Sequence, residues 1–300
     1  MRIISALLVH LFLALWILAG VGAPALARDG AEAGTLRPLP WHLVDYRHAL
    51  PGDSRTGLAF ETLAVTVELQ GQARKGDFFY LAALWGKIDG NGFYFGLQTD
   101  LHDGGQRPTG GKQSGRFQGP GLIFSRWGNS DPVNARPPAD GWVVVPGPNT
   151  PYEGQTLSLR RPFDWQAGRY RFELHGSPAE PPLRGVWLSL RVRPVSAPDS
   201  WTPDSWTDGG SLYFPTVVPR PHLDLHPVTF AEIYGRASST ISLESLASTL
   251  PRRALTLFPL ELDGKVYPPD GKASTPTGVP GYVNSTPLAA DRTVRLDLLP

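Results

Sequence analysis

Apolar and polar residues alternate with a period of two along many short segments of this chain, and almost nowhere with the period of a helix. The clearest segment is residues 92–100, where apolar side chains alternate with small or polar ones: Phe93, Phe95 and Leu97 with Tyr94, Gly96 and Gln98. A strand of this composition packs one face in a core and presents an aromatic and amide face on the other side. The pattern predicts an all-β fold, an antiparallel β-sandwich of two sheets.

Turn residues separate the predicted strands. Asp89-Gly90-Asn91-Gly92 joins the apolar run 78–88 to the segment 92–100, and Asp-Gly and Asn-Gly pairs favour a tight hairpin. The chain contains 33 glycines and 31 prolines, which mark turns between the other predicted strands. These strands are residues 63–69, 121–128, 142–145, 155–161, 169–175, 186–192, 211–218 and 228–234.

The first 27 residues read as a secretory signal. A basic start, an apolar run and Ala25-Leu26-Ala27 predict cleavage after Ala27, and the 16-residue apolar run from Ile3 to Leu18 falls short of a membrane span. The mature chain then has no transmembrane segment. We expect a sandwich domain over residues 28–236 and a strand-bearing extension over 237–300, which is also compatible with completing the same sandwich.

Charge and cysteine content exclude several classes of function. Without Arg2 the basic and acidic residues are equal at 27 each, so the mature chain has no basic excess for binding nucleic acid. There are no cysteines, which excludes disulfides, thiolate metal sites and cysteine catalysis. The histidines show no metal-ligand spacing, so we expect no metal or cofactor.

Several segments resemble a family of uncharacterised bacterial secreted proteins. These segments are Tyr94-Phe95-Gly96-Leu97-Gln98, Ile123-Phe124-Ser125-Arg126-Trp127, Tyr152-Glu153-Gly154-Gln155 and Arg161-Pro162-Phe163-Asp164-Trp165. The family is similar in pairing a "YFG-x-Q" strand with an "IFS-x-W" strand. The resemblance implies a concanavalin-like, jelly-roll type sandwich and brings no established activity.

The sequence offers few carboxylates at spacings that suit catalysis. Sandwich glycosidases carry carboxylates on alternate residues of one strand, and that E-x-D-x-x-E triplet is missing here. The residues left as candidates for an acid or base are Asp100, Glu153 and Glu173. The segment 169–175 also reads as a solvated strand face of alternating charge.

A second group of residues indicates a sugar-binding surface. Each lies on the more polar face of its own predicted strand: Tyr94, Gln98, Ser125, Trp127, Trp187 and Arg191. Aromatic rings with amide and guanidinium donors suit a polysaccharide or cell-envelope glycan. A one-residue change of register would instead direct Trp127 and Trp187 into the core. Glycan binding is therefore the leading functional hypothesis. The first alternative is a carbohydrate-active enzyme, a glycoside hydrolase or polysaccharide lyase, and the second is a structural envelope domain.

Overall fold

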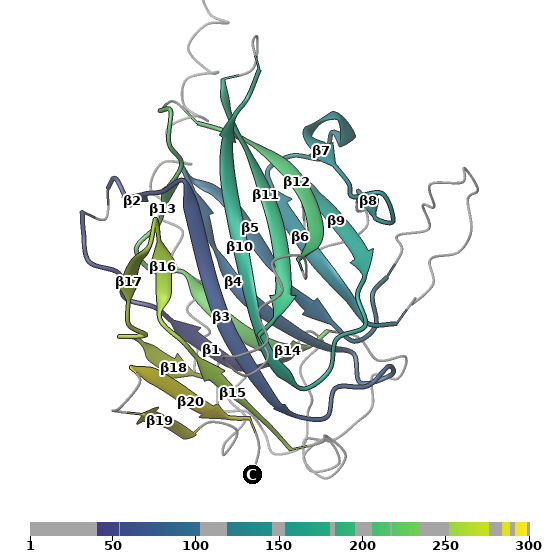
Figure 1. Cartoon of the computed structure of the whole chain (residues 1–300), viewed down its shortest axis with the longest axis vertical. Coiled ribbons are helices and arrows are strands. Elements are labelled where there is room, and N and C mark those ends of the chain that lie inside the picture. Colours follow the sequence, from purple (N-terminus) through teal and green to yellow (C-terminus); the bar gives the residue numbers. More distant parts are fainter. Residues whose placement is uncertain are drawn as a thin grey trace, which may run out of the picture. The chain divides into compact units, whose positions relative to one another are not determined.

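The computed structural model describes residues 41–53, 55–102, 119–145, 154–180, 184–195, 206–216, 218–234, 252–275, 284–288 and 292–298. Over these residues the chain forms two antiparallel sheets that pack face to face, with sheet B nearer the viewer and sheet A behind it (Figure 1). The part that the structure describes contains no α-helix, only the short 3₁₀ turn Pro132–Asn134. The predicted all-β sandwich is confirmed.

Sheet A contains ten strands. In spatial order its main path is β18 (Lys272–Ser274), β1 (Trp41–Arg47), β14 (Val228–Ile233), β4 (Phe79–Ile88), β5 (Asn91–Gln98), β6 (Gly121–Trp127), β9 (Thr156–Pro162) and β8 (Trp142–Val144), and β13 (His222–Leu223) pairs with both β4 and β2 (Leu58–Ala59).

Sheet B also contains ten strands. Its main path is β19 (Asn284–Leu288), β20 (Thr293–Asp297), β15 (Arg253–Leu257), β3 (Thr62–Gly71), β10 (Gly168–Pro178), β11 (Gly185–Pro194), β12 (Thr207–Pro215) and β7 (Ala135–Arg136), and β16 (Leu260–Leu262) pairs with both β3 and β17 (Lys265–Tyr267). The strands after residue 250 therefore pair with strands of both sheets, since β15 and β16 join β3 and β18 joins β1.

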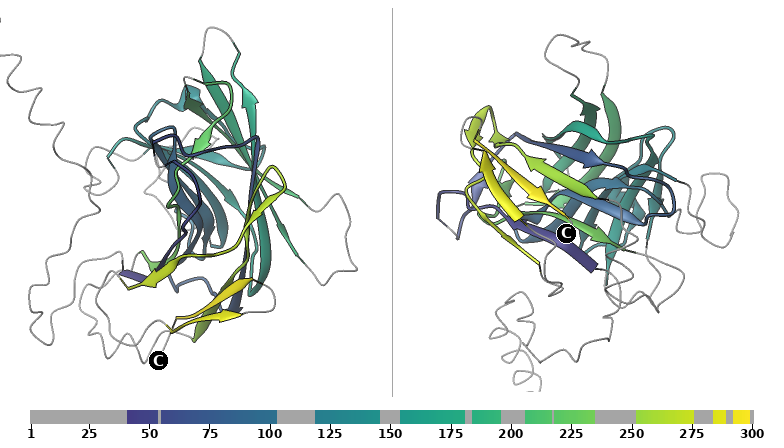
Figure 2. Two further views of the ribbon diagram at one scale, coloured as in Figure 1. Left: turned by 90° about the vertical axis from the view of Figure 1, so that its left-hand side faces the viewer. Right: turned by 90° about the horizontal axis from the view of Figure 1, so that it is seen from below.

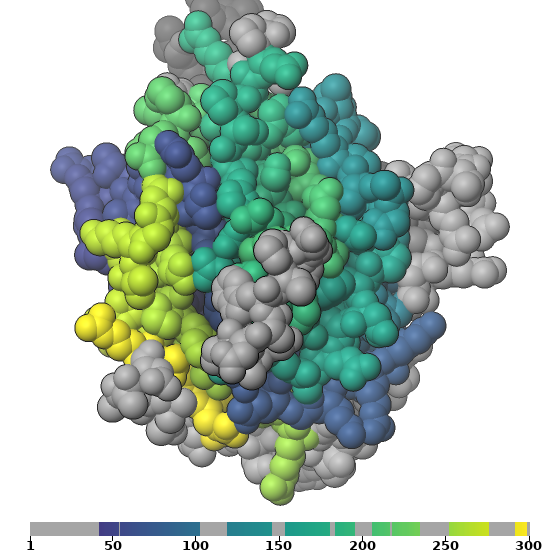
Figure 3. All heavy atoms as spheres, in the orientation of Figure 1, coloured from purple at the N-terminus to yellow at the C-terminus, as the bar shows by residue number. Residues whose placement is uncertain are grey.

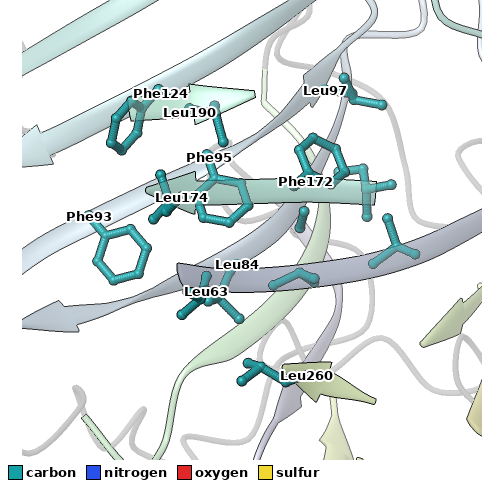
Figure 4. Packing of buried hydrophobic residues seen from close by; sticks show 14 of the residues in the cluster. Leu63, Leu84, Phe93, Phe95, Leu97, Phe124, Phe172, Leu174, Leu190 and Leu260 are labelled. Carbon is teal, nitrogen blue, oxygen red and sulfur yellow. The ribbon is translucent and has the colours of Figure 1, made fainter. Parts of the chain in front are cut away.

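The core lies between the two sheets, as the turned views show (Figure 2). Phe95 of β5 and Phe172 of β10 meet there with ring centroids 5.6 Å apart, and Phe95 also packs against Phe124 of β6 at 6.4 Å (Figure 4). All three side chains are fully buried. The alternation predicted for residues 92–98 is observed, because Phe93 and Leu97 also belong to this core.

The predicted hairpin is formed by β4 and β5. Its turn uses two residues with positive φ, Asp89 at 47° and Gly90 at 81°, which is the backbone that Asp-Gly sequences favour. The predicted signal, residues 1–27, lies outside the described residues, as do residues 103–118 and 235–251.

One buried histidine lies between the sheets next to the end of β1. His48 is 3 % exposed, and its Nε2 lies 3.0 Å from the hydroxyl of Thr229. Thr229 donates its own proton to the carbonyl of Ala83, so it must accept from His48 and Nε2 carries a hydrogen. Burial lowers the pKa of His48 to about 4 from the ordinary 6.5.

This histidine is expected to make the fold sensitive to mild acid. As pH falls below 6.5, His48 binds a proton in the unfolded chain, but in the folded chain it stays neutral until about pH 4. The free energy of unfolding therefore declines across this window by about 3 kcal/mol. Urea denaturation at pH 7, 5.5 and 4 should show a smaller decline for His48→Gln, which retains an N–H for Thr229. Equal declines in the two proteins would show that His48 does not titrate in this way.

Candidate functional site

The outer face of sheet A points away from the core and carries a second cluster of apolar side chains, here called the outer aromatic cluster. Its buried members are Tyr80, Ala82, Tyr94, Leu101, Ile123, Val228 and Phe230, with Trp85, Trp127, Trp142 and Tyr234 packed against them. None of these residues belongs to the core between the sheets. Seven of the cluster's members are therefore large rings that the sandwich core does not use.

Aromatic rings follow one another across β14, β4, β5 and β6. The centroids of Phe230 and Tyr80 are 5.5 Å apart, those of Tyr80 and Tyr94 are 6.0 Å apart, and those of Tyr94 and Trp127 are 4.8 Å apart. Trp127 then meets Trp85 edge to face at 6.4 Å. The three tryptophans of the cluster are only half-buried, so part of each indole remains on the surface.

The position of Trp127 depends on a glycine in the neighbouring strand. A Cβ atom at Gly92 of β5 would lie 2.8 Å from Cε3 of the Trp127 ring. The absence of a side chain at Gly92 lets the indole lie over β5, where it reaches Tyr94. The Gly-x-Tyr spacing at the start of β5 thus supports the ring contacts of the surface.

Hydroxyl, amide and guanidinium groups lie on the same face as the rings. Ser125 of β6 donates to Ser158 of β9 at 2.8 Å, and the Nε of Arg160 donates to the same Ser158 oxygen at 3.3 Å. Gln98 lies directly opposite Tyr80 in the β4–β5 pair and is 8 % exposed. Its backbone carbonyl accepts a hydrogen bond of 2.9 Å from the indole of Trp165.

A carboxylate and histidine group lies on the same face, on β1 and β14. His42 stacks on Phe230 at 4.7 Å, with Nδ1 2.6 Å from Asp45 and Nε2 3.2 Å from Glu232. Burial lowers the pKa of His42, but the hydrogen bond and charge of Asp45 and the charge of Glu232 raise it by more, so the pKa lies above its ordinary value. The alternation of Val228, Phe230 and Glu232 was a signal that sequence reasoning overlooked.

Four of the six predicted binding residues come together on this face. Tyr94 and Ser125 are direct cross-strand partners, and Trp127 packs on Tyr94. Gln98 is four residues from Tyr94 along β5 and points to the same side. Trp127 does not enter the core, so the alternative register is wrong for this residue.

Trp187 and Arg191 lie instead on the outer face of sheet B, which Figure 3 shows with β10 to β12 in teal and green across its middle. The guanidinium of Arg136 lies 3.9 Å from the centre of the Trp187 ring, and Arg191 lies 4.2 Å from the ring of Trp206. Trp187 is also absent from the core. The predicted single platform is thus divided between two opposite faces of the sandwich.

The predicted catalytic carboxylates have structural contacts. Asp100 accepts hydrogen bonds from the backbone N–H groups of Gly76 and Phe78 at 2.7 and 2.9 Å and is 2 % exposed. Its carboxylate therefore holds the turn before β4. Glu153 lies outside the described residues.

Glu173 is the centre of an ion-pair network on sheet B. Its carboxylate contacts Arg171 at 2.8 Å, Arg191 at 2.5 Å and His175 at 3.0 Å. Burial raises its pKa, but hydrogen bonds from these three side chains lower it by more, so the pKa lies well below its ordinary range. Glu173 is 7 % exposed, so this position is not the solvated one that the alternating charges predicted.

Within the described ranges, no group of three or more histidine or carboxylate side chains is placed to hold a metal ion. The same residues include no helix with the length and apolar character needed to cross a membrane.

The sequence matches no protein-family model, and it matches no curated protein. Among solved structures, the chain is similar to Scytalido-glutamic peptidase bound to a peptide-based transition state analog, with 10 % identity, a TM-score of 0.41, and coverage of 85 % of this chain and 98 % of that one. It is also similar to the marine PL-14 alginate lyase from Aplysia kurodai, with 9 % identity, a TM-score of 0.32, and coverage of 68 % and 70 %.

Proposed function

We propose that the protein binds a glycan on the outer face of sheet A. The observation that carries this proposal is the line of rings formed by Tyr80, Tyr94, Trp127 and Trp85, which lies outside the core with its tryptophans half-buried. The half-buried indoles of Trp85 and Trp127 bring this line of rings to the surface, and contiguous apolar surface commonly marks a binding site in a soluble protein. Flat rings beside hydroxyl and amide groups suit a sugar, which has both apolar C–H faces and polar hydroxyls.

Export belongs to the same proposal. Glycans of this kind lie at the cell envelope or outside it, and the signal predicted for residues 1–27 would deliver the chain there. N-terminal sequencing of exported protein should begin at Arg28. Recovery of the uncleaved chain would contradict the predicted cleavage.

Cleavage of the bound glycan is a second candidate function. It is favoured by one observation, the contact of His42 with both Asp45 and Glu232 on the face that carries the rings. A carboxylate and an imidazole at one site can serve as general acid and base. Reducing ends or unsaturated sugars released from a bound polysaccharide would support a hydrolase or a lyase.

Replacement of Trp127 by alanine tests the binding proposal. Because Trp127 stacks on the outer surface, we expect retention on the glycan to fall by tenfold or more, taking as a guide the loss of about 1 to 3 kcal/mol when an aromatic side chain that stacks on a nucleic-acid base is replaced by alanine. The melting temperature should fall by only a few degrees, because the core keeps all of its residues. Affinity electrophoresis in polysaccharide gels and a thermal melt measure the two effects.

Trp206→Ala is the matched control for this experiment. Trp206 is also a half-buried tryptophan in contact with arginine side chains, but it lies on the outer face of sheet B. Its replacement should leave retention unchanged. Equal loss of retention in both variants, or none in either, would remove the outer aromatic cluster from the proposal.

A further inference from the structure

Arg160 is a buried cation on the outer face of sheet A. It lies on β9 directly opposite Ile123 of β6 on one side and Trp142 of β8 on the other, and it is 9 % exposed. Among the residues that the structure describes, no carboxylate lies within 4.0 Å of its guanidinium nitrogens, whereas the buried Arg253 pairs with Asp77. Burial of a charge without a counter-charge is costly.

Among the residues that the structure describes, Arg160 makes two hydrogen bonds. Nε donates to the Ser158 hydroxyl at 3.3 Å, and Nη1 donates to the backbone carbonyl of His102 at 2.5 Å. A guanidinium has five N–H donors in a planar fork, and both acceptors here are neutral. Asp100 lies beyond ion-pair distance of Arg160, and its carboxylate accepts hydrogen bonds from Gly76, Phe78 and Thr99.

The surrounding side chains also offer donors without acceptors. Ser158 accepts from both Ser125 and Arg160, which leaves its own hydrogen for a further acceptor. Within the described ranges, the buried Oγ1 of Thr156 and the buried Nε1 of Trp142 have no hydrogen-bond partner. Thr156 is 1 % exposed and alternates with Ser158 and Arg160 along β9.

An excess of donors around an unneutralised guanidinium fits an acceptor-rich anion. A neutral sugar hydroxyl would satisfy one donor and leave the charge of Arg160 uncompensated. A planar carboxylate or a sulfate can accept several of these hydrogen bonds at once, and it suits the fork of an arginine. The half-buried ring of Trp142, opposite Arg160, gives the sugar itself a surface for stacking.

We infer that the glycan bound on this face is acidic, and that Arg160 and Ser158, with Trp142 beside them, receive its carboxylate or sulfate group. The inference rests on the proposed glycan binding and adds the chemical class of the ligand. Tyr94 and Trp127 then bind the neighbouring sugar, because Tyr94, Ser125 and Ser158 lie in register across β5, β6 and β9.

The test is a panel of charged polysaccharides and their neutral counterparts. Polygalacturonate is compared with methyl-esterified pectin, which has the same backbone without the charge, and dextran sulfate is compared with dextran. We expect the protein to be retained on polygalacturonate or on dextran sulfate and not on the neutral counterpart of that polymer. Retention on polygalacturonate indicates a carboxylate ligand, and retention on dextran sulfate indicates a sulfate ligand. Retention should weaken as NaCl is raised, because salt screens the ion pair.

Variants of Arg160 separate the charge from the fold. Arg160→Gln should weaken binding of the acidic glycan by about 30-fold or more, and Arg160→Lys should recover only part of the loss because it lacks the planar fork. Arg169→Gln is the control, since it removes an exposed arginine that pairs with Glu68 on sheet B. If Arg160→Gln fails to fold, the lysine variant and the salt dependence of the natural protein still decide the point.

The outcomes distinguish this inference from the proposal on which it rests. Equal retention on charged and neutral polymers, with loss of binding in Trp127→Ala alone, would leave the binding face in place and overturn the acidic ligand. Unchanged binding of the acidic glycan by Arg160→Gln would also overturn it. Retention on none of the polymers would count against both.

Discussion

Replacement of Gly96 by alanine is expected to leave little folded protein. A Cβ atom at this position would lie 1.9 Å from the backbone oxygen of Leu81 and 2.9 Å from the Cα of Ala82. Both are atoms of the adjacent strand β4, which no side-chain rotation can move away. The pair β4–β5 is also irregular here, with a register shift between Ala82 and Leu84. Stability should fall by at least about 3 kcal/mol, the upper part of the range for overpacking.

Gly176→Ala is the matched control, because Gly176 is also a glycine within a strand, in β10. A Cβ there would meet its nearest atoms, Glu61 O and Pro221 Cγ, at 3.6 Å, which is ordinary van der Waals contact. Urea denaturation of both variants should show a large loss at position 96 and less than about 0.5 kcal/mol at position 176. Similar stability of the two variants would contradict the close approach of β4 to Gly96.

The hairpin around these residues was predictable because its signals are local. Asp89 and Gly90 supply the turn, and the alternation along β5 separates core side chains from outer ones. The role of Gly96 was not predictable in the same way. The sequence shows a glycine within a strand, but the atom that excludes a side chain belongs to Leu81 of the neighbouring strand.

The candidate site was predictable only where sequence neighbours are also spatial neighbours. Alternation identifies the outward side of a strand, and β5 and β6 are adjacent in sheet A, so Tyr94 and Trp127 were found together. Trp187 has the same pattern, but its strand β11 belongs to sheet B. Period-two alternation does not tell which sheet a strand joins.

The carboxylate and histidine group shows the same limit over a longer range. Strand β14 pairs with β1 on one side and β4 on the other, which places Glu232 next to both His42 and Tyr80. These residues come from distant parts of the chain, and no local motif links them. Likewise, the sequence showed Arg160 only as one of several charged residues, because sheet order decides which of the described side chains lie next to it.

Trp165 connects the core to the site and gives the second large effect. It is 2 % exposed, belongs to the core cluster and donates from its indole to the carbonyl of Gln98 at 2.9 Å. Trp165→Ala should destabilise the fold by about 3 to 5 kcal/mol, because it removes a large buried ring and leaves a cavity. The carbonyl of Gln98 would also lose its donor.

A phenylalanine at position 165 separates these two contributions. Trp165→Phe keeps a buried ring but removes the N–H. It should lower the stability of the fold by about 1 kcal/mol for the lost hydrogen bond, in addition to the loss from the cavity that the smaller ring leaves. Urea denaturation gives the stability of both variants, and hydrogen exchange at the end of β5 reports on the strand that carries Gln98. If Trp165 positions that strand, exchange should rise there in both variants, and more in the alanine variant. An alanine variant as stable as the natural protein would mean that the indole does not fill the core. Unchanged hydrogen exchange in the phenylalanine variant would mean that the indole N–H of Trp165 does not hold Gln98 in place.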